Sequence, residues 1–430
     1  MLQAPAAPAV SVFTPAPWPL WRRLLFRFTA IYLLLYLSPL TWLGMFPGIS
    51  ILSDGYNQAE NWLVTAANQH LFHIKDQLVP FNGSGDTSYG YAQLSFFALA
   101  ALLGMVFWSL VDKRRQYDRL AYWTLVVLRY YVASVALSYG IVKLFGLQMS
   151  FPSLSQLATP LGDLLPMRFS WLFIGYSKPY QFFSGAVEVL AGGLLLWRRT
   201  ATLGAFVSAS VFLNVMVLNF CYDIPVKLFS THLFVFSNLL LVSDARRLLD
   251  FFVFNRPTQP SRSLRFSNRP ARIAQTVLKV AFVFFFGIMP LYQTYQSFSS
   301  PPSPPGPLKA GFYEVTEFRS SLPDSLRWQN VVFETTTSGS IQTPDTLFRQ
   351  RYRRGYFVYR LDSTQQTLAF KKLSGDSLPV LTFRLARPDT SRLVLRGLYR
   401  GDSLTVTLRR TNHQFQLAER QFHWLSEANR

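Results

Sequence analysis

The chain has 430 residues, of which 50% are hydrophobic and only 15% are charged. Ordinary soluble proteins carry about 25% charged residues, so this composition, with several apolar runs near 20 residues, predicts a polytopic membrane protein. The net charge is +20, and many of the Arg residues stand in short connections between the runs. Basic residues there set membrane orientation, so we expect no nucleic-acid partner. The single cysteine, Cys221, excludes an intrachain disulfide and a Cys-based metal site.

Seven apolar segments are long enough to cross a hydrocarbon core of roughly 30 Å as helices. They are 24–46, 91–111, 120–147, 180–197, 201–221, 226–243 and 273–293. One set of connections holds fifteen Lys and Arg residues and the opposite set holds four. The positive-inside rule therefore makes residues 1–23 a cytoplasmic N-terminal tail and puts the C-terminal part outside after seven crossings. We expect a multi-pass protein of the inner (cytoplasmic) membrane, with the lipid bilayer as its first partner.

Two outer loops carry structure of their own in this scheme. In the first loop, 47–90, apolar residues recur at helical spacing over 56–79, which predicts a helix on the outer membrane surface. The second loop, 148–179, is rich in Pro, Ser and Leu. We expect it to form a short lid.

A change of composition follows the last apolar segment. Residues 294–308 form a Pro-rich linker, and beyond it the chain alternates between apolar and polar residues. Six alternating stretches predict strands: 328–334, 356–361, 367–372, 381–385, 392–397 and 404–409. The predicted fold is therefore an all-α membrane bundle, 24–293, followed by an extracytoplasmic all-β domain, 309–430. This domain is expected to be an antiparallel barrel or sandwich of about eight strands.

A basic run stands between two of the predicted strands. It consists of Arg349, Arg351, Arg353 and Arg354, followed by Gly355. We expect a solvated hairpin tip. The alternative is a contact with acidic polymers or lipid head groups.

Two opposite charges lie inside predicted spans at matching depth. Arg129 is nine residues from Leu120, and Glu188 is nine residues from Trp197. At about 1.5 Å per residue, each lies about 14 Å from the cytoplasmic end of its segment. Ionisable groups cost roughly 2.5 to 3.5 kcal/mol each in hydrocarbon, so they usually pair or function. We predict an Arg129–Glu188 pair, either at a ligand site or as a structural clamp between helices.

A second polar position lies nearer the outer face. Lys143 shares a helix face with Arg129, because fourteen residues make four turns within about 40°. Tyr139 lies along this seam, as a packing aromatic or a hydrogen-bond donor. Asp223 is at a depth where it would meet Lys143, although the amine can instead extend to water. The outer hairpin that carries this carboxylate has four polar residues: Asn219, Tyr222, Asp223 and Lys227.

His232 is the one histidine within a predicted span, so a bis-His haem is excluded. With Asn214 or Asn219 as further hydrogen-bonding groups, it is a candidate quinone site. Such polar residues also commonly hold helices together. His70 and His73 stand three residues apart on the outer-loop helix without an evident third ligand, so we predict no metal site.

Several of these residues fall into a recognisable pattern. Arg129 is followed by Gly140-Ile-Val-Lys143, and the next span reads Gly185-Ala-Val-Glu188-Val-Leu-Ala-Gly192-Gly193. Residues 198–204, Arg-Arg-Thr-Ala-Thr-Leu-Gly, continue the pattern. Over residues 120–252 the chain resembles the DoxX family of small membrane proteins. The other spans and the β domain are additional to a four-helix DoxX core.

The resemblance implies a class of function. Some DoxX-like proteins are subunits of thiosulfate:quinone oxidoreductase or partners of membrane oxidoreductases. We expect a membrane subunit that binds a quinone or another small amphiphile in the Arg129–Lys143–Glu188 seam, beside an oxidoreductase partner. Whether it is itself an enzyme stays open, and quinone is the one cofactor indicated. The alternative is a non-enzymatic envelope protein whose bundle anchors a periplasmic β domain that binds a partner or ligand.

Overall fold

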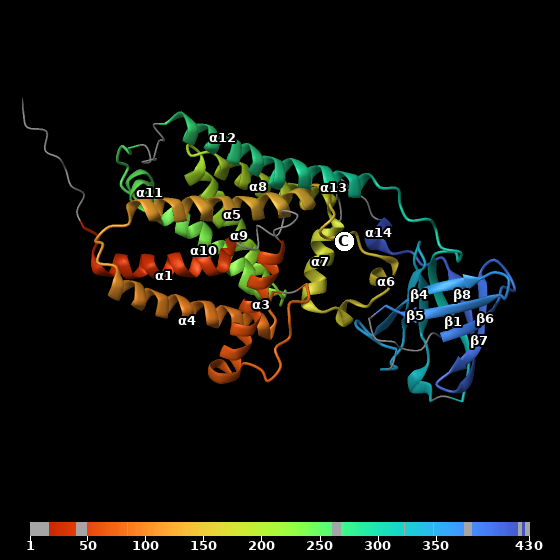
Figure 1. Ribbon diagram of the computed structural model, residues 1–430. Helices are drawn as coiled ribbons and strands as arrows, with labels where there is room; N and C mark the ends of the chain where they lie inside the picture. Colours follow the sequence, from red (N-terminus) through yellow and green to blue (C-terminus); the bar gives the residue numbers. More distant parts are fainter. Residues whose placement is uncertain are drawn as a thin grey trace, which may run out of the picture. The chain divides into compact units, whose positions relative to one another are not determined.

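Apolar runs and alternating runs occupy different parts of this chain, and they fold into different elements. The computed structural model describes residues 17–39, 50–83, 85–259, 268–321, 323–346, 348–373, 381–419 and 424–425. Contacts divide the chain into two units, Met1–Gly140 with Ala186–Pro290, and Ile141–Gly185 with Leu291–Arg430. The first unit is helical, and the second contains a closed antiparallel β-barrel (Figure 1).

Most of the long helices begin and end close to predicted apolar segments, while residues 40–46 of the predicted segment 24–46 lie outside the described residues. The long helices are α1 (Leu20–Leu37), α3 (Ser50–Ala67), α4 (Ser88–Val111), α5 (Asp118–Leu144), α8 (Lys178–Leu196), α9 (Ala201–Cys221), α10 (Lys227–Val242), α11 (Ala245–Phe252), α12 (Arg269–Val283) and α13 (Met289–Ser299). Two π-helical turns, η1 (Asn68–Phe72) and η3 (Phe284–Ile288), extend α3 and join α12 to α13. The outer-loop helix predicted at 56–79 is thus helical from Ser50 to Phe72.

Four helices are long and apolar enough to cross a membrane: α4, α5, α9 and the continuous helix Arg269–Ser299. A fifth crossing results if α10 and α11, bent by 75°, count as one span. The other two predicted spans are helical but more polar, because α1 holds three Arg residues and α8 begins with Lys-Pro-Tyr-Gln. The described residues therefore provide four or five such helices, and seven transmembrane helices are not confirmed.

Two of these helices leave most of their apolar surface uncovered by the rest of the protein. In the apolar windows of Arg269–Ser299 and α4, only 0% and 11% of residues are buried. Soluble monomers rarely expose apolar patches larger than a few hundred Å², so surfaces of this kind suit hydrocarbon or a partner helix. Within the helical unit, α1 packs beside α4 and α9 beside α10 (Figure 1).

Small residues let α5 and α8 approach closely. A Cβ atom added to Gly192 would lie 2.8 Å from Leu137 Cγ and 3.1 Å from the Ala133 carbonyl oxygen. Gly193, on the next position of the helix, has open space instead. Only the first glycine therefore serves helix packing, in the manner of small residues in membrane bundles.

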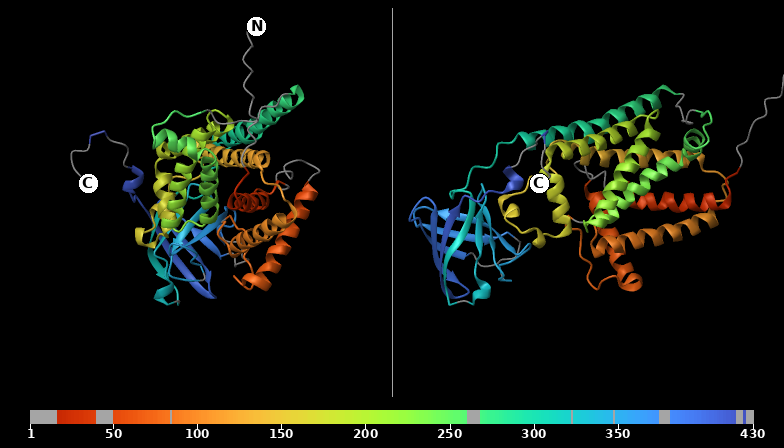
Figure 2. Two further views of the ribbon diagram at one scale, coloured as in Figure 1. Left: turned by 90° about the vertical axis from the view of Figure 1, so that its left-hand side faces the viewer. Right: turned by 180° about the vertical axis from the view of Figure 1, so that it is seen from behind.

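The β domain is an up-and-down barrel in which each strand pairs with its sequence neighbour and the last pairs with the first (Figure 2). Its strands are β1 (Gly311–Arg319), β2 (Asn330–Phe333), β3 (Ser338–Gln342), β4 (Arg354–Asp362), β5 (Thr367–Lys372), β6 (Leu381–Ala386), β7 (Arg392–Tyr399) and β8 (Asp402–Thr411). The antiparallel barrel and the expected number of strands are confirmed. Six strands fall at predicted positions, whereas β1 and β3 were missed.

Aromatic side chains fill the described interior of the barrel. Phe357 and Phe370 stack with ring centroids 4.2 Å apart, and Phe383 lies 5.5 Å from Phe370. Each of these three side chains is at most 1% exposed. This packing follows the inward positions of the alternating pattern, as in other small barrels whose interior is closed by side chains.

The segment predicted as a second outer loop belongs to the barrel unit. It folds into α6 (Leu154–Leu157), η2 (Leu161–Asp163) and α7 (Pro166–Tyr176). The Glu334 carboxylate accepts hydrogen bonds from the backbone of Leu154 (3.2 Å) and Ser155 (2.8 Å). Arg353 Nε forms an ion pair with Asp163 at 3.0 Å. The lid predicted at 148–179 therefore packs on the strands around β2 and β4.

One residue of the basic run departs from the expectation of a solvated tip. Arg354 is completely buried, donating to Ser340 Oγ at 2.8 Å and to Asn330 Oδ1 at 2.9 Å. Burial lowers the pKa of its guanidinium to about 10. The prediction was wrong for this residue because strand alternation does not reveal what covers the outer face of a barrel.

Candidate ligand pocket around His232

Helix periodicity brings aromatic and imidazole side chains together from α1 and α10. Tyr32 and Tyr36 stand four residues apart on α1, and His232 and Phe236 stand four apart on α10. Residues at this spacing share one face of a helix. Polar and aromatic groups that are distant in the sequence thereby form one cluster.

The two ring nitrogens of His232 have different partners. Nδ1 lies 2.7 Å from the Leu228 carbonyl oxygen, and Nε2 lies 2.5 Å from the Tyr32 hydroxyl. A carbonyl oxygen only accepts, so Nδ1 carries the proton and donates. In the neutral imidazole, Nε2 is then the acceptor and the phenol of Tyr32 is the donor.

Aromatic rings surround this imidazole. Tyr36 stacks on it with ring centroids 4.2 Å apart at an interplanar angle of 16°. The Tyr32 ring lies 5.9 Å away and parallel within 2°, and Phe236 meets the imidazole edge at 5.6 Å. The rings fix the plane of the imidazole while its hydrogen bonds fix its rotation.

A cavity of about 130 Å³ opens beside the imidazole. α1, α4, the loop before α4 and α10 contribute its walls. The lining residues are Tyr32, Tyr36, Phe81, Gly85, Gly90, Gln93, Leu94, Phe97, Leu228, Phe229 and His232. Gln93 also donates a hydrogen bond to the Glu60 carboxylate of α3, which adds a polar group beside mostly apolar walls.

Asp86 fixes the loop of this cavity to the first turn of α10. Its carboxylate accepts hydrogen bonds from the backbone of Lys227 (2.8 Å) and Leu228 (2.9 Å). Lys227 Nζ lies 3.8 Å from the same carboxylate, and Gly85 N donates to the Pro225 carbonyl at 3.1 Å. An anion at a helix N-terminus satisfies unpaired N–H groups and complements the helix dipole.

The predicted outer-hairpin residues are distributed around α9 and α10. Asn219 donates to Ser230 Oγ at 2.9 Å and ties the two helices together. Tyr222 directly follows α9, and Asp223 pairs with Lys227 at 2.7 Å with its side chain 83% exposed. Of this group, Lys227 reaches the cavity loop through Asp86.

Asn214 and Tyr139 lie outside the cavity lining. Asn214 is exposed on α9, and Asn219 is held by the hairpin. The proposed role of either asparagine as a hydrogen-bonding group beside His232 therefore has no geometric support. The Tyr139 ring lies 6.1 Å from Phe229, which lines the cavity. Tyr139 thus contacts the wall and not the imidazole.

None of the three charged residues of the predicted seam is among the residues that line this cavity. Glu188 is 1% exposed and Lys143 is 8% exposed. The Arg129 guanidinium lies 5.2 Å from the Tyr130 ring centroid. Among the described residues, the ion pairs do not include a direct Arg129–Glu188 pair. A contact between the two side chains through a bridging water stays a prediction. The Lys143–Asp223 contact likewise stays a prediction.

Sequence reasoning found His232 but missed Tyr32, Tyr36 and Asp86. An aromatic residue in an apolar run has the signature of ordinary packing. Asp86 caps a helix that begins 141 residues later, so no local capping signal exists. Within the described part of the chain, no group of three His, Cys, Asp or Glu side chains is arranged to hold a metal ion.

Comparison with known proteins gives one partial similarity. The chain is 42% identical over 83 residues to the uncharacterized protein YwoB of Bacillus subtilis (strain 168). The matched region is 19% of this chain and 54% of YwoB, so the chain spans about half the length of the curated relative it matches. No family model matches the chain. No solved structure matches it either.

Proposed function

We propose that this chain is a multi-pass membrane protein whose helical unit binds a quinone, or another small amphiphile with a flat polar head, in the His232 pocket. The Tyr32–His232 hydrogen bond beside the Tyr36 ring is the observation that carries this proposal. A quinone head is a flat ring with two carbonyl acceptors. It can lie against aromatic walls while the Tyr32 phenol donates to one carbonyl.

The size of the cavity favours a head group. At about 130 Å³, it is smaller than the roughly 300–1,000 Å³ that encloses a drug-sized ligand. A single substituted ring fits this space. An attached isoprenoid chain would lie in the bilayer, against the exposed apolar faces of the helices.

The donor and acceptor pair suits both redox forms of such a ligand. In the oxidised form, the Tyr32 phenol would turn from Nε2 of His232 to the ligand carbonyl. In the reduced form, a ligand hydroxyl would donate to Nε2, which remains an acceptor because Nδ1 holds its proton against Leu228. That reduction takes two electrons and two protons. The electrons would come from the redox cofactor of a partner protein, and the protons would come from solvent.

The proposed setting is the inner membrane, with the N-terminal tail in the cytoplasm and the barrel outside. Fifteen basic residues on one set of loops against four on the other support this orientation. Seven crossings are proposed, with α1 and α8 as the two more polar ones. Polar spans of this kind are stable where they pack inside a bundle.

The DoxX resemblance over residues 120–252 supports the same class of function. We propose a DoxX-like core that serves a membrane oxidoreductase system as its quinone-binding subunit. The Arg129–Lys143–Glu188 seam is then a further polar region of that core. In this proposal the barrel is an addition on the outer side.

The test uses the full chain in mild detergent and a short-chain ubiquinone analogue, followed by quenching of tryptophan fluorescence. Tyr32→Phe removes one hydroxyl, and the loss of a hydrogen bond of about 1–1.5 kcal/mol predicts roughly tenfold weaker binding. Tyr180→Phe, at an exposed position of α8, is the matched control. Equal affinity for the parent and both variants would refute the pocket.

A second function is favoured by one feature of the barrel. Arg384 and Arg396 lie directly opposite each other on β6 and β7, and both are exposed. Like charges in such a cross-strand pair are destabilising, so an acidic partner bound there would reduce the repulsion between the two guanidinium groups. In this alternative the bundle anchors a non-enzymatic barrel that binds an acidic envelope polymer.

Polyphosphate is a suitable probe for this alternative. The Arg384→Gln/Arg396→Gln double variant should lose binding, while Arg360→Gln, an exposed position of β4, should keep most of it. No binding by the parent chain at low salt would exclude the alternative, since such contacts are strongest there.

A further inference from the structure

Three cationic side chains converge on another part of the helical unit. Arg129 lies on α5, Arg198 is the second residue after the end of α8, and Lys279 lies on α12. Arg129 and Arg198 both act electrostatically on Lys279, and Arg198 also acts on Arg129. Neither Arg129 nor Lys279 forms an ion pair with any carboxylate among the described residues, and the buried Arg129 Nε has no hydrogen-bond partner there. The three positive charges repel one another, and together they attract an anion.

Aromatic rings support each of the three cations. Lys279 Nζ lies 4.3 Å from the Trp197 ring centroid. The guanidinium of Arg129 lies 5.2 Å from the Tyr130 ring, and that of Arg198 lies 6.0 Å from the Tyr122 ring. Ring faces stabilise cations without neutralising them, so these ring contacts leave the positive charge of the cluster in place.

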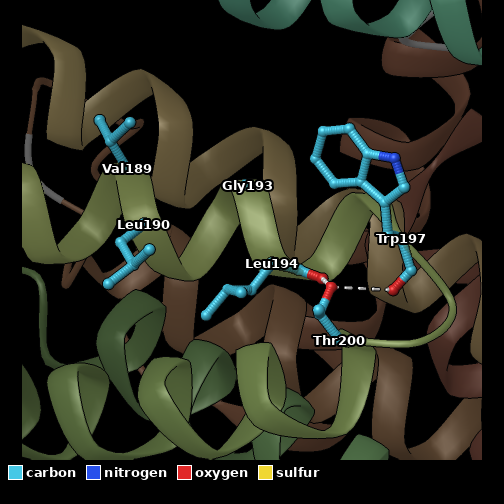
Figure 3. A pocket seen from close by; sticks show the side chains of 6 residues that line it. All are labelled: Val189, Leu190, Gly193, Leu194, Trp197 and Thr200. Carbon is cyan, nitrogen blue, oxygen red and sulfur yellow. Dashed lines mark hydrogen bonds between the residues drawn. The ribbon is translucent and has the colours of Figure 1, made fainter.

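An apolar hollow of about 420 Å³ begins at the same tryptophan. Its lining residues are Val189, Leu190, Gly193, Leu194, Trp197 and Thr200. Figure 3 shows Val189 and Trp197 on one side of α8, with Leu190 and Leu194 directed to the other side. Thr200 Oγ1 donates to the Leu194 carbonyl at 2.7 Å, so the polar hydroxyl at this end is already satisfied.

Gly193 gives the hollow its depth. A Cβ atom added there would meet nothing within 4 Å. The glycine is therefore not required for helix packing, unlike Gly192, and it leaves a strip of apolar surface open between Val189 and Trp197. An acyl chain is the ligand that such a strip suits.

We propose that this site binds one anionic phospholipid, with its phosphate held by Arg129, Arg198 and Lys279 and one acyl chain along the hollow of α8. The positive cluster suits the anionic head group of that lipid. The apolar strip, which also ends at Trp197, suits its acyl chain. Basic pockets between membrane helices bind anionic head groups on the cytoplasmic side, where the Arg198 loop is placed by the proposed topology. The site rests on the membrane setting of the proposed function and not on its quinone pocket.

The test is native mass spectrometry of the full chain with phosphatidylglycerol or phosphatidylcholine added to the detergent. We expect retention of one phosphatidylglycerol and little phosphatidylcholine. A juxtamembrane cation contributes about 1 kcal/mol to anionic-lipid binding, so Lys279→Gln and Arg198→Gln should each weaken retention about fivefold. Arg199→Gln changes the charge equally at an exposed neighbour and should have little effect.

Gly193→Leu tests the acyl strip separately. It should reduce retention of phosphatidylglycerol because the new side chain fills the strip, while the thermal unfolding midpoint stays unchanged. Glycerol phosphate, which has the anion without a chain, should not compete at lipid concentrations. Equal retention of both lipids, or the same weakening by Arg199→Gln as by Lys279→Gln, would overturn the proposal. Quinone binding is measured independently, so failure of one site leaves the other intact.

Discussion

The Tyr32 hydroxyl lies 2.5 Å from Nε2 of His232, which joins α1 to α10 across 200 residues of sequence. In the neutral imidazole the two contacts fix the tautomer, because Nδ1 donates to the Leu228 carbonyl and Nε2 is left to accept from Tyr32. The Tyr32–His232 contact also makes the pocket depend on both helices being in register.

Asp86→Ala should destabilise the helical unit by about 1–2 kcal/mol, the usual loss for a helix cap. Its carboxylate accepts from the backbone of Lys227 and Leu228, and its side chain is only 6% exposed. Thermal unfolding of the full chain in detergent measures this loss. Asp223→Ala is the control, since that carboxylate is 83% exposed and also contacts Lys227. A larger loss for Asp223→Ala would contradict the capping role.

Gly192→Leu should destabilise the bundle by roughly 1–3 kcal/mol, the range for overpacking a close contact. The cause is the approach to Leu137, where even a Cβ atom would lie 2.8 Å from Cγ. Gly193→Leu introduces the same side chain one position along and should leave the unfolding midpoint within error. Equal effects of the two substitutions would show that α5 and α8 do not pack as described.

Stability of the barrel should fall in alkaline solution. Burial raises the pKa values of Tyr313, Tyr356, Tyr359 and Tyr399 above that of a free tyrosine. A raised folded-state pKa means that the folded state holds more protons above pH ~10, so stability is complete below that pH and declines above it. Urea unfolding of the full chain across this range measures the decline.

Tyr399→Phe separates this titration from general alkaline damage. The Tyr399 phenol also donates to the buried Asp345 carboxylate, so the variant should lose stability at neutral pH and show a shallower alkaline decline. Tyr292→Phe, at an exposed position of α13, should match the parent at every pH. An unchanged slope in Tyr399→Phe would remove this residue from the explanation.

The sequence predicted those helices and strands whose own residues carry the pattern of hydrophobicity that defines them. α9 and β5 have the predicted bounds, Ala201–Cys221 and Thr367–Lys372, because α9 is an apolar run of spanning length and β5 alternates between apolar and polar residues. β3 reads Ser-Gly-Ser-Ile-Gln and has little strand propensity. It is a strand because its neighbours pair with it, and the backbone at Gly339 lies so close to Val332 that a Cβ atom would be 2.4 Å from the carbonyl oxygen.

The residues of the candidate sites also fall into two groups: those recognisable from residue type, and those brought in by the tertiary fold. His232 was identifiable because a histidine is rare within an apolar run. Its partners were not, since Tyr32 resembles a packing residue and the Asp86 contact depends on the tertiary fold. Arg354 was expected in water because sequence does not show that the loop containing α6 and α7 folds on the same barrel. Residue type thus predicted candidates, and long-range packing decided which of them meet.

Cys221 offers a direct test of the proposed orientation. It is the one cysteine of the chain, and it is exposed at the C-terminal end of α9, beside the hairpin that the charge distribution places outside. A membrane-impermeant maleimide should therefore label the parent chain in intact spheroplasts and leave Cys221→Ser unlabelled. Arg199→Cys in the Cys221→Ser background puts the thiol on the predicted cytoplasmic side and should react only after permeabilisation. The opposite labelling pattern would invert the topology, and with it the leaflet in which the Arg129–Arg198–Lys279 cluster meets lipid.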